Sequence, residues 1–126
     1  MRRIRGQDTN PELAVRRIVY RLGFRYRLHV AKLPGKPDLV FSRLRKIIEV
    51  RGCFWHCHRG CIDSHIPRSR VEYWLPKLKG NVQRDKKNQK ALEREGWRIL
   101  IVWACETEGG AAGDLAKKLA RFLTED

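Results

Sequence analysis

The ten residues from Gly52 to Cys61 concentrate side chains that bind metals and exchange protons. Their sequence, GCFWHCHRGC, contains three of the four cysteines and two of the four histidines of the chain. A short apolar run, residues 47–50, comes directly before them and is typical of a buried strand. We therefore interpret this stretch as a metal-organised loop at a strand end that also presents catalytic side chains.

Thiolates and one imidazole give this loop the donors of a zinc site. Cys53, His58 and Cys61 lie close in sequence, and Cys105 follows the last predicted strand. Three thiolates and one imidazole complete a tetrahedral zinc site with no open position, which makes such a site structural rather than catalytic. We expect it to join the loop to the far strand end.

The same stretch leaves other ligand sets open. Cys57 in place of His58 would give four cysteines, His65 is also near, and reduced thiols packed without metal are the alternative. The sequence contains no signal peptide, so we expect a cytoplasmic protein. Disulfides are rare there, and clustered cysteines then favour a metal.

The charge of the chain points to a polyanionic partner. It has 28 Lys and Arg against 14 Asp and Glu, a formal net charge of +14 in 126 residues. The basic residues are spread among aromatic ones, which favours a globular domain that binds nucleic acid. No apolar run is long enough to span a bilayer, so we expect no membrane partner. The length predicts a single domain over residues 1–126.

The rest of the chain predicts the elements that position these residues. A first helix starts near Asp8–Asn10 with Pro11 in its first turn and ends at Gly23. The further predicted elements are strands over 24–30, 38–41 and 46–50, a helical region after Pro67 that Pro76 limits, a second helix over 82–95, a strand over 97–103 and a helix capped by Asp114. This order predicts an α/β fold with a mixed central sheet flanked by helices.

Two carboxylates lie at the ends of predicted elements. Asp38 opens a strand, directly after the turn Leu33–Pro37. Glu12 lies in the first turn of the first helix, where a negative charge is favourable in any protein. An active-site role for Glu12 is the competing interpretation.

With these residues in view, the chain resembles the very short patch repair (Vsr) endonucleases, DNA mismatch nickases with a restriction-endonuclease-like core. The resemblance covers almost the whole chain, and its most specific part is Gly52–His56 followed by a His/Cys pair. The matching segments are Ile4–Gly6 with Asp8–Thr9, Pro11–Glu12, Leu33–Asp38, Gly52–His56, Glu72–Trp74, Lys77, Asn81 with Arg84–Asp85, and Gly96–Trp97 through Val102–Trp103 to Cys105.

The resemblance implies a magnesium-dependent active centre. Asp38 matches the metal-binding aspartate, and Val50 matches the residue whose backbone carbonyl helps to hold Mg²⁺. His56 matches a catalytic histidine, Glu12 a supporting acid, and Asp85 a residue that supports the site through polar contacts. The residues alone also allow His56 to be a structural histidine of the loop.

The resemblance also implies a zinc site and a DNA-contacting surface. The family's zinc ligands match Cys53, His58, Cys61 and Cys105. The aromatic residues that wedge into the duplex beside the mismatch match Phe54, Trp55 and Trp74, and Met1 falls where the N-terminal segment approaches DNA from the other groove. A core position is the competing interpretation for Trp74.

One position departs from the family pattern. Arg51 stands before Gly52, where the family often has a histidine or an acid. A guanidinium keeps its proton at working pH, so Arg51 is excluded as a general base or acid, although it could stabilise charge on the phosphate. The run Glu49–Arg51 resembles the Glu-x-Lys element of the restriction nucleases, which makes Glu49 a candidate second carboxylate ligand of Mg²⁺.

The sequence therefore predicts an endonuclease that nicks one strand of duplex DNA at T:G mismatches, which arise when 5-methylcytosine deaminates. A restriction-type or structure-specific nuclease of the same fold is one alternative. A zinc-stabilised DNA-binding module without catalysis is the other. The resemblance implies cooperation with other mismatch-repair proteins, and the size of the chain and its lack of heptads predict a monomer.

Overall fold

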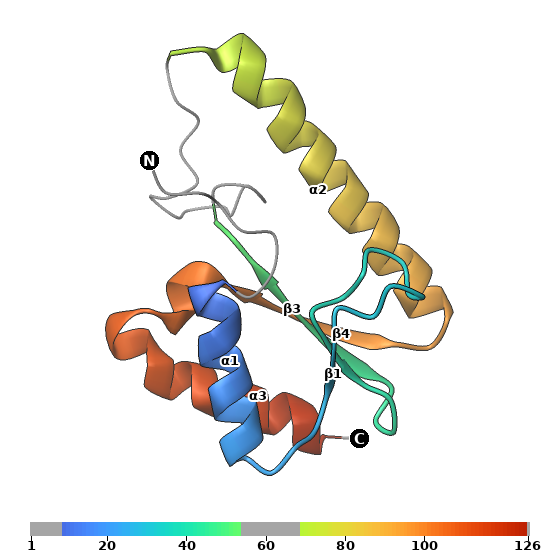
Figure 1. The fold of residues 1–126 in the computed structure, drawn as a ribbon, viewed down its shortest axis with the longest axis vertical. Helices are drawn as coiled ribbons and strands as arrows, with labels where there is room; N and C mark the ends of the chain where they lie inside the picture. Colours follow the sequence, from blue (N-terminus) through green and yellow to red (C-terminus); the bar gives the residue numbers. More distant parts are fainter. Residues whose placement is uncertain (1–8, 54–68, 126) are drawn as a thin grey trace.

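The chain forms a sheet with helices on both sides (Figure 1). In this computed structural model, the described residues are 9–53 and 69–125. Their elements are α1 (Asn10–Arg21), β1 (Arg27–Leu28), β2 (Leu39–Phe41), β3 (Lys46–Arg51), α2 (Val71–Arg94), β4 (Arg98–Trp103), the short 3-10 helices η2 (Ala104–Thr107) and η3 (Gly109–Ala111), and α3 (Ala112–Thr124). Within these ranges, no helix has both the length and the apolar character needed to cross a membrane.

The four strands make one mixed sheet in the order β1-β2-β3-β4. β2 is antiparallel to both β1 and β3, whereas β3 and β4 run parallel. The β3–β4 ladder extends from Lys46 opposite Arg98 to Arg51 opposite Trp103. The predicted mixed sheet flanked by helices is thus confirmed, and the carboxyl ends of β3 and β4 meet at one edge of the sheet.

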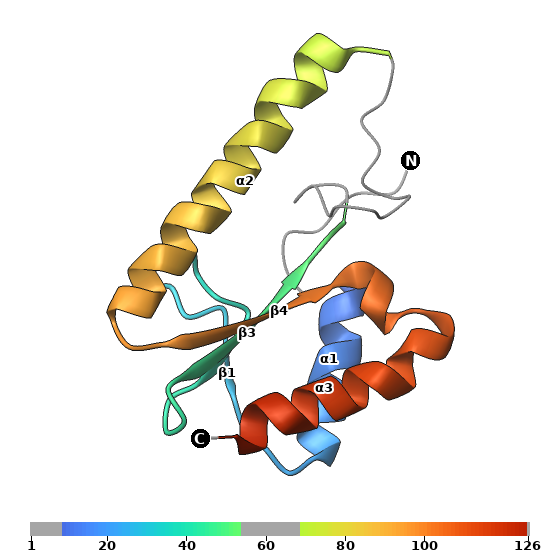
Figure 2. The ribbon, with the colours of Figure 1, turned by 180° about the vertical axis from the view of Figure 1, so that it is seen from behind.

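The sheet separates two hydrophobic cores. α1 and α3 cover one face and α2 covers the other, as the two opposite views show (Figures 1 and 2). β2 and β3 contribute to both cores because successive side chains of a strand point to opposite faces. The core under α1 and α3 contains Val15, Val19, Leu39, Phe41, Ile48, Val102, Leu115, Leu119 and Leu123. The core under α2 contains Val40, Ile47, Leu92 and Trp97.

Helix α1 begins where the sequence predicts. The hydroxyl of Thr9, the N-cap residue, accepts a hydrogen bond from the backbone N–H of Glu12 at 3.4 Å, and Pro11 occupies the first turn. The helix ends at Arg21, and Gly23 follows with a φ of 95°, which glycine adopts readily. This start fixes Glu12 at the N-terminal end of α1.

Helix α2 is continuous from Val71 to Arg94, so the prediction of a separate second helix that begins near Val82 is wrong. Pro76 lacks an N–H and therefore removes one backbone hydrogen bond from the second turn. Buried leucines anchor the helix on both sides of Gly80, because Leu78 and Leu92 are almost fully excluded from solvent. These contacts offset the cost of the proline.

Strand β1 is shorter than predicted. The alternating pattern over residues 24–30 is present, since Phe24 and Tyr26 pack against the core, but only Arg27 and Leu28 pair as a strand. His29 follows with a φ of 46°, in the left-handed region that ends a regular strand. The pattern therefore holds for Phe24 and Tyr26 but not for Leu28, which is 41% exposed, and the predicted strand is too long.

A buried lysine joins the sheet to the end of α3. Lys46 is 3% exposed, and its Nζ donates hydrogen bonds to the backbone carbonyls of Phe122 and Glu125. The ammonium group also lies 5.3 Å from the centre of the Phe122 ring. A cation in this place satisfies carbonyls that the end of a helix leaves without partners.

Replacing Lys46 should therefore destabilise the fold. Lys46→Met keeps the apolar stem but removes the donor to the carbonyls of Phe122 and Glu125, so we expect the free energy of unfolding to fall by about 1–3 kcal/mol. Chemical denaturation measures this difference. The exposed Lys117 on α3 is the matched control, and Lys117→Met should change the stability by less than about 0.5 kcal/mol. Equal effects of the two substitutions would contradict the role of Lys46.

Candidate active site

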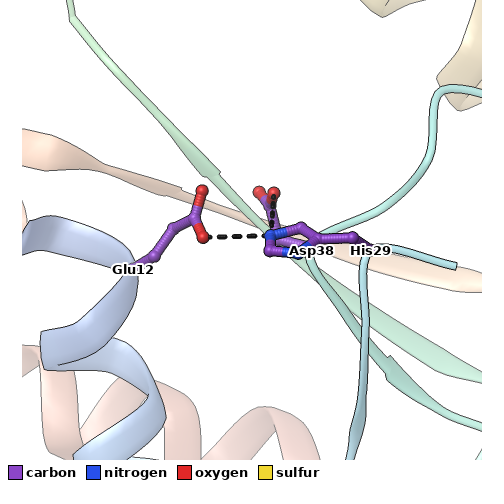
Figure 3. Close-up of side chains that lie close together, drawn as sticks. All are labelled: Glu12, His29 and Asp38. Carbon is purple, nitrogen blue, oxygen red and sulfur yellow. Dashed lines mark hydrogen bonds and ion pairs between the residues drawn. The ribbon is translucent and has the colours of Figure 1, made fainter. Parts of the chain in front are cut away.

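Three side chains from separate parts of the chain converge at one end of the sheet (Figure 3). Glu12 comes from α1, His29 follows β1, and Asp38 precedes β2. The Nε2 atom of His29 lies 3.1 Å from Oε2 of Glu12 and 3.8 Å from Oδ1 of Asp38. One ligand atom from each of the three residues lies within 4.8 Å of the others, close enough to share one metal ion.

Asp38 is held against the central strand. Its Oδ2 accepts a hydrogen bond from the backbone N–H of Val50 in β3 at 2.8 Å. The pKa of this carboxyl is raised from 3.8 to about 7, mainly by burial and to a smaller extent by the nearby carboxylates of Glu12 and Glu49, while the Val50 N–H and His29 oppose the shift. A nearby divalent cation would favour the ionised form, so this carboxylate has the electrostatic character of a metal ligand.

Glu12 is buried and has two basic partners. Its side chain is 3% exposed, and Oε2 lies 3.0 Å from Nη2 of Arg16, one turn later in α1, in addition to its contact with His29. The sequence left two interpretations of Glu12, a helix-end charge and an active-site acid. Its position fits both, because the first turn of α1 faces Asp38 across His29 (Figure 3).

A second charged group connects β3 to α2. Nη2 of Arg51 lies 3.0 Å from Oε2 of Glu49, and its Nε lies 4.0 Å from Oδ2 of Asp85 in α2. Arg51 is 9% exposed, so this pairing takes place largely away from water. The structure thus brings three of the predicted site residues together, with the arginine between the two carboxylates.

The remaining predicted residues divide into described and undescribed positions. Cys53 and Cys105 each lie two residues beyond the last β3–β4 pair, Arg51 and Trp103, so both cysteines follow the same edge of the sheet. The other predicted zinc ligands and DNA-contacting or catalytic residues lie outside the described residues: Met1, Phe54, Trp55, His56, His58 and Cys61, with the alternatives Cys57 and His65.

Trp74 lies at the start of α2 beside a second aromatic residue. Its ring meets that of Tyr73 edge to face, with ring centres 5.0 Å apart and an angle of 84° between the planes. Tyr73 is 43% exposed, and the charged groups of Arg70 and Lys77 lie 4.6 and 4.2 Å from its ring centre. Aromatic rings mixed with cations are typical of surfaces that bind nucleic acid.

His29 is the member of the site that the sequence did not predict. It occupies a polar position of an alternating segment, where a histidine is usually an ordinary surface residue. Its proximity to Asp38 depends on the pairing of β1 with β2, which places Leu28 opposite Leu39. The sequence offered one signal: His29 lies near the end of one predicted strand, and Asp38 opens the next strand along the chain.

A mixed sheet between helices, with carboxylates gathered at a strand end, defines a class of α/β protein that includes metal-dependent nucleases. Residues 1–62 match the family described as DNA mismatch endonuclease Vsr. The chain belongs to this family, and it is an endodeoxyribonuclease that nicks DNA.

Several curated relatives share most of the chain. The type II nicking enzyme V.XorIIP of Xanthomonas oryzae pv. oryzae is 47% identical over 123 residues, which cover 98% of this chain and 88% of the relative. V.NmeAIP of Neisseria meningitidis serogroup A is 40% identical, over 99% of this chain and 87% of the relative. The DNA mismatch endonuclease Vsr of Escherichia coli K12 is 40% identical, over 86% and 69% respectively.

The raised pKa of Asp38 predicts a pH-dependent stability. The folded state binds this proton more tightly than the unfolded state, so its stabilising contribution is complete below about pH 4 and is lost as the pH rises through about 7. Asn cannot ionise, so Asp38→Asn removes this loss of stability at high pH. In buffer free of divalent cations, the variant should already be more stable than the wild type at pH 5, and its advantage should grow by a few kcal/mol between pH 5 and pH 8.

Melting temperatures at pH 5, 6, 7 and 8 measure this difference. Asp114 is an exposed carboxylate in the first turn of α3, and Asp114→Asn should give a difference that stays constant over the same range. A constant difference for Asp38→Asn as well would contradict the buried, proton-binding state of Asp38.

Proposed function

We propose that this endonuclease nicks one strand of duplex DNA at a T:G mismatch by Mg²⁺-dependent hydrolysis of a phosphodiester bond. The observation that carries the proposal is the convergence of Glu12, His29 and Asp38 within 4.8 Å at the end of the sheet. The E. coli relative, described as a DNA mismatch endonuclease, supports the substrate. Mismatches of this kind arise when 5-methylcytosine deaminates.

The donor set suits Mg²⁺, which prefers oxygen ligands and keeps several waters. Asp38, the backbone carbonyl of Val50 and Glu49 are the proposed ligands, and the hydrogen bond from the Val50 N–H holds Asp38 beside the strand that carries the other two. When bound, the ion would neutralise phosphate charge and lower the pKa of a bound water.

The protein groups around this centre have separate proposed tasks. His56 would position the attacking water and accept its proton, since a histidine titrates near neutral pH. Glu12 would serve as a supporting acid beside Asp38, and Asp85 would support the centre through polar contacts. Arg51 would stabilise negative charge on that phosphate, because its contacts with Glu49 and Asp85 hold a permanent cation at the end of β3.

Recognition of the mismatch would use aromatic wedges. Unstacking a base step costs a few kcal/mol and costs least where pairing is already faulty. Phe54 and Trp55 would enter the duplex from the loop, Trp74 from the start of α2, and Met1 would approach the other groove. Action as a monomer, and cooperation with other mismatch-repair proteins, belong to the same proposal.

A structural zinc ion would hold the loop in place. The proposed ligands are Cys53, His58, Cys61 and Cys105, with Cys57 as the alternative to His58. The equal offset of Cys53 and Cys105 from the last β3–β4 pair supports a shared site, because both thiols follow the same edge of the sheet. Three thiolates and one imidazole would close the site to substrate.

Loss of one thiol should release the zinc. We expect Cys105→Ser to lose most of the bound zinc and to lower the melting temperature by at least about 5 °C. Metal analysis of the purified protein and thermal melting measure both effects. Cys57→Ser is the matched control and should retain zinc. Zinc loss from Cys57→Ser would instead favour the four-cysteine set.

The nicking reaction itself tests the proposed substrate. A labelled duplex with one T:G mismatch should be cut once, in the strand that carries the mismatched thymine, with Mg²⁺ present and not after chelation of divalent cations. Asp38→Asn should lower the nicking rate at least about 100-fold, because it removes a metal ligand, while duplex binding without metal changes little. The exposed Asp114→Asn is the control and should nick at the wild-type rate.

The same assay separates the alternatives. Cleavage of the matched duplex at a similar rate would favour a restriction-type or structure-specific nuclease. Tight mismatch binding by the wild type without any nick would favour a DNA-binding module whose centre is altered at Arg51. Full nicking by Asp38→Asn would remove Asp38 from the active centre.

A further inference from the structure

His29 is held beside Asp38 by the backbone. Its N–H donates to the carbonyl of Asp38 at 3.0 Å, which extends the β1–β2 pairing by one residue beyond Leu28 and Leu39. At this point its φ is 46°, a value that residues with a Cβ adopt rarely. Strained backbone of this kind occurs often where a side chain must be aimed at a site. Here the imidazole lies toward the two carboxylates (Figure 3).

The distances within this group match the edges of a metal coordination shell. With metal–ligand bonds of about 2.1 Å, neighbouring ligands of an octahedral ion lie about 3.0 Å apart and opposite ligands about 4.2 Å apart. Nε2 of His29 lies 3.1 Å from Glu12 and 3.8 Å from Asp38. Small adjustments would therefore bring all three atoms onto one ion.

We propose that His29 binds the catalytic cation directly through Nε2, beside Asp38 and Glu12, and that this nitrogen ligand makes the centre prefer Mn²⁺ to Mg²⁺. The inference rests on the proposed metal-dependent function. It adds one nitrogen ligand, from His29, to the oxygen ligands proposed for the cation. Imidazole binds first-row transition metals well, whereas Mg²⁺ favours oxygen donors. Two carboxylates balance the charge of a divalent ion, and the neutral imidazole supplies a donor without further charge.

A simple hydrogen bond from His29 to Glu12 is the competing explanation of the same geometry. Two observations favour a ligand. Oε2 of Glu12 already lies 3.0 Å from Nη2 of Arg16, so its negative charge has a permanent cationic partner without His29. The same Nε2 also lies 3.8 Å from Oδ1 of Asp38, so the imidazole nitrogen stands between two carboxylates rather than beside one.

Pulsed electron paramagnetic resonance of bound Mn²⁺ tests the inference directly. Mn²⁺ is added at pH 8, without Mg²⁺ or DNA, to the full chain as purified, and ¹⁴N modulation of the echo reports a nitrogen ligand. The wild type should show this coupling. His29→Asn should lose it, because asparagine tolerates the same backbone conformation but offers an amide oxygen in place of the nitrogen.

Binding constants give a second measurement. We expect His29→Asn to weaken Mn²⁺ binding about 10-fold or more, while Mg²⁺ binding changes less, so that the preference for Mn²⁺ falls. His29→Gln serves as the second variant if His29→Asn fails to fold. His56→Asn is the matched control, because it removes another histidine of the proposed centre and should keep the nitrogen coupling.

Three outcomes would overturn the inference: no nitrogen coupling in the wild type, coupling that persists in His29→Asn, or coupling that disappears in His56→Asn instead. None of these outcomes depends on nicking. Mismatch nicking without nitrogen coupling would reject His29 as a ligand and leave the proposed function intact. Nitrogen coupling without mismatch nicking would support His29 as a ligand and reject the proposed function.

Discussion

The fold has to hold three carboxylates close together in a place largely shielded from water. Glu12, Asp38 and Glu49 come from a helix, a strand start and a central strand, and their mutual repulsion opposes this arrangement. Each carboxylate has a different compensating partner. Arg16 and His29 serve Glu12, the Val50 N–H serves Asp38, and Arg51 serves Glu49. The polar contacts at this end of the sheet are therefore those that offset the repulsion between the three carboxylates.

Strand β3 distributes these contacts between the two layers of helices. Its Ile48 belongs to the core under α1 and α3, and its Ile47 to the core under α2. The same alternation continues at its end, where the side chain of Val50 packs against the core under α1 and α3 and the side chain of Arg51 reaches Asp85 in α2. The backbone N–H of Val50 also donates to Asp38. One central strand therefore sets the position of the predicted active centre relative to both layers.

The sequence predicted the parts of this arrangement that depend on local patterns. The mixed sheet and the start of α1 near Thr9 both follow from patterns of neighbouring residues. Pro76 misled the helix prediction, because sequence alone does not show that Leu78 and Leu92 would anchor both halves of α2. His29 was missed because its role depends on which residue of β2 lies opposite β1, and that register is set by tertiary packing.

The unequal size of the two cores has a consequence for how the molecule opens. Among the described residues, nine buried side chains form the core under α1 and α3, and four form the core under α2. Local unfolding costs less free energy where less apolar surface is buried, so α2 belongs to a weaker cooperative unit than α1. Detachment of α2 would separate Asp85 from Arg51 and leave Glu12 packed on the larger core.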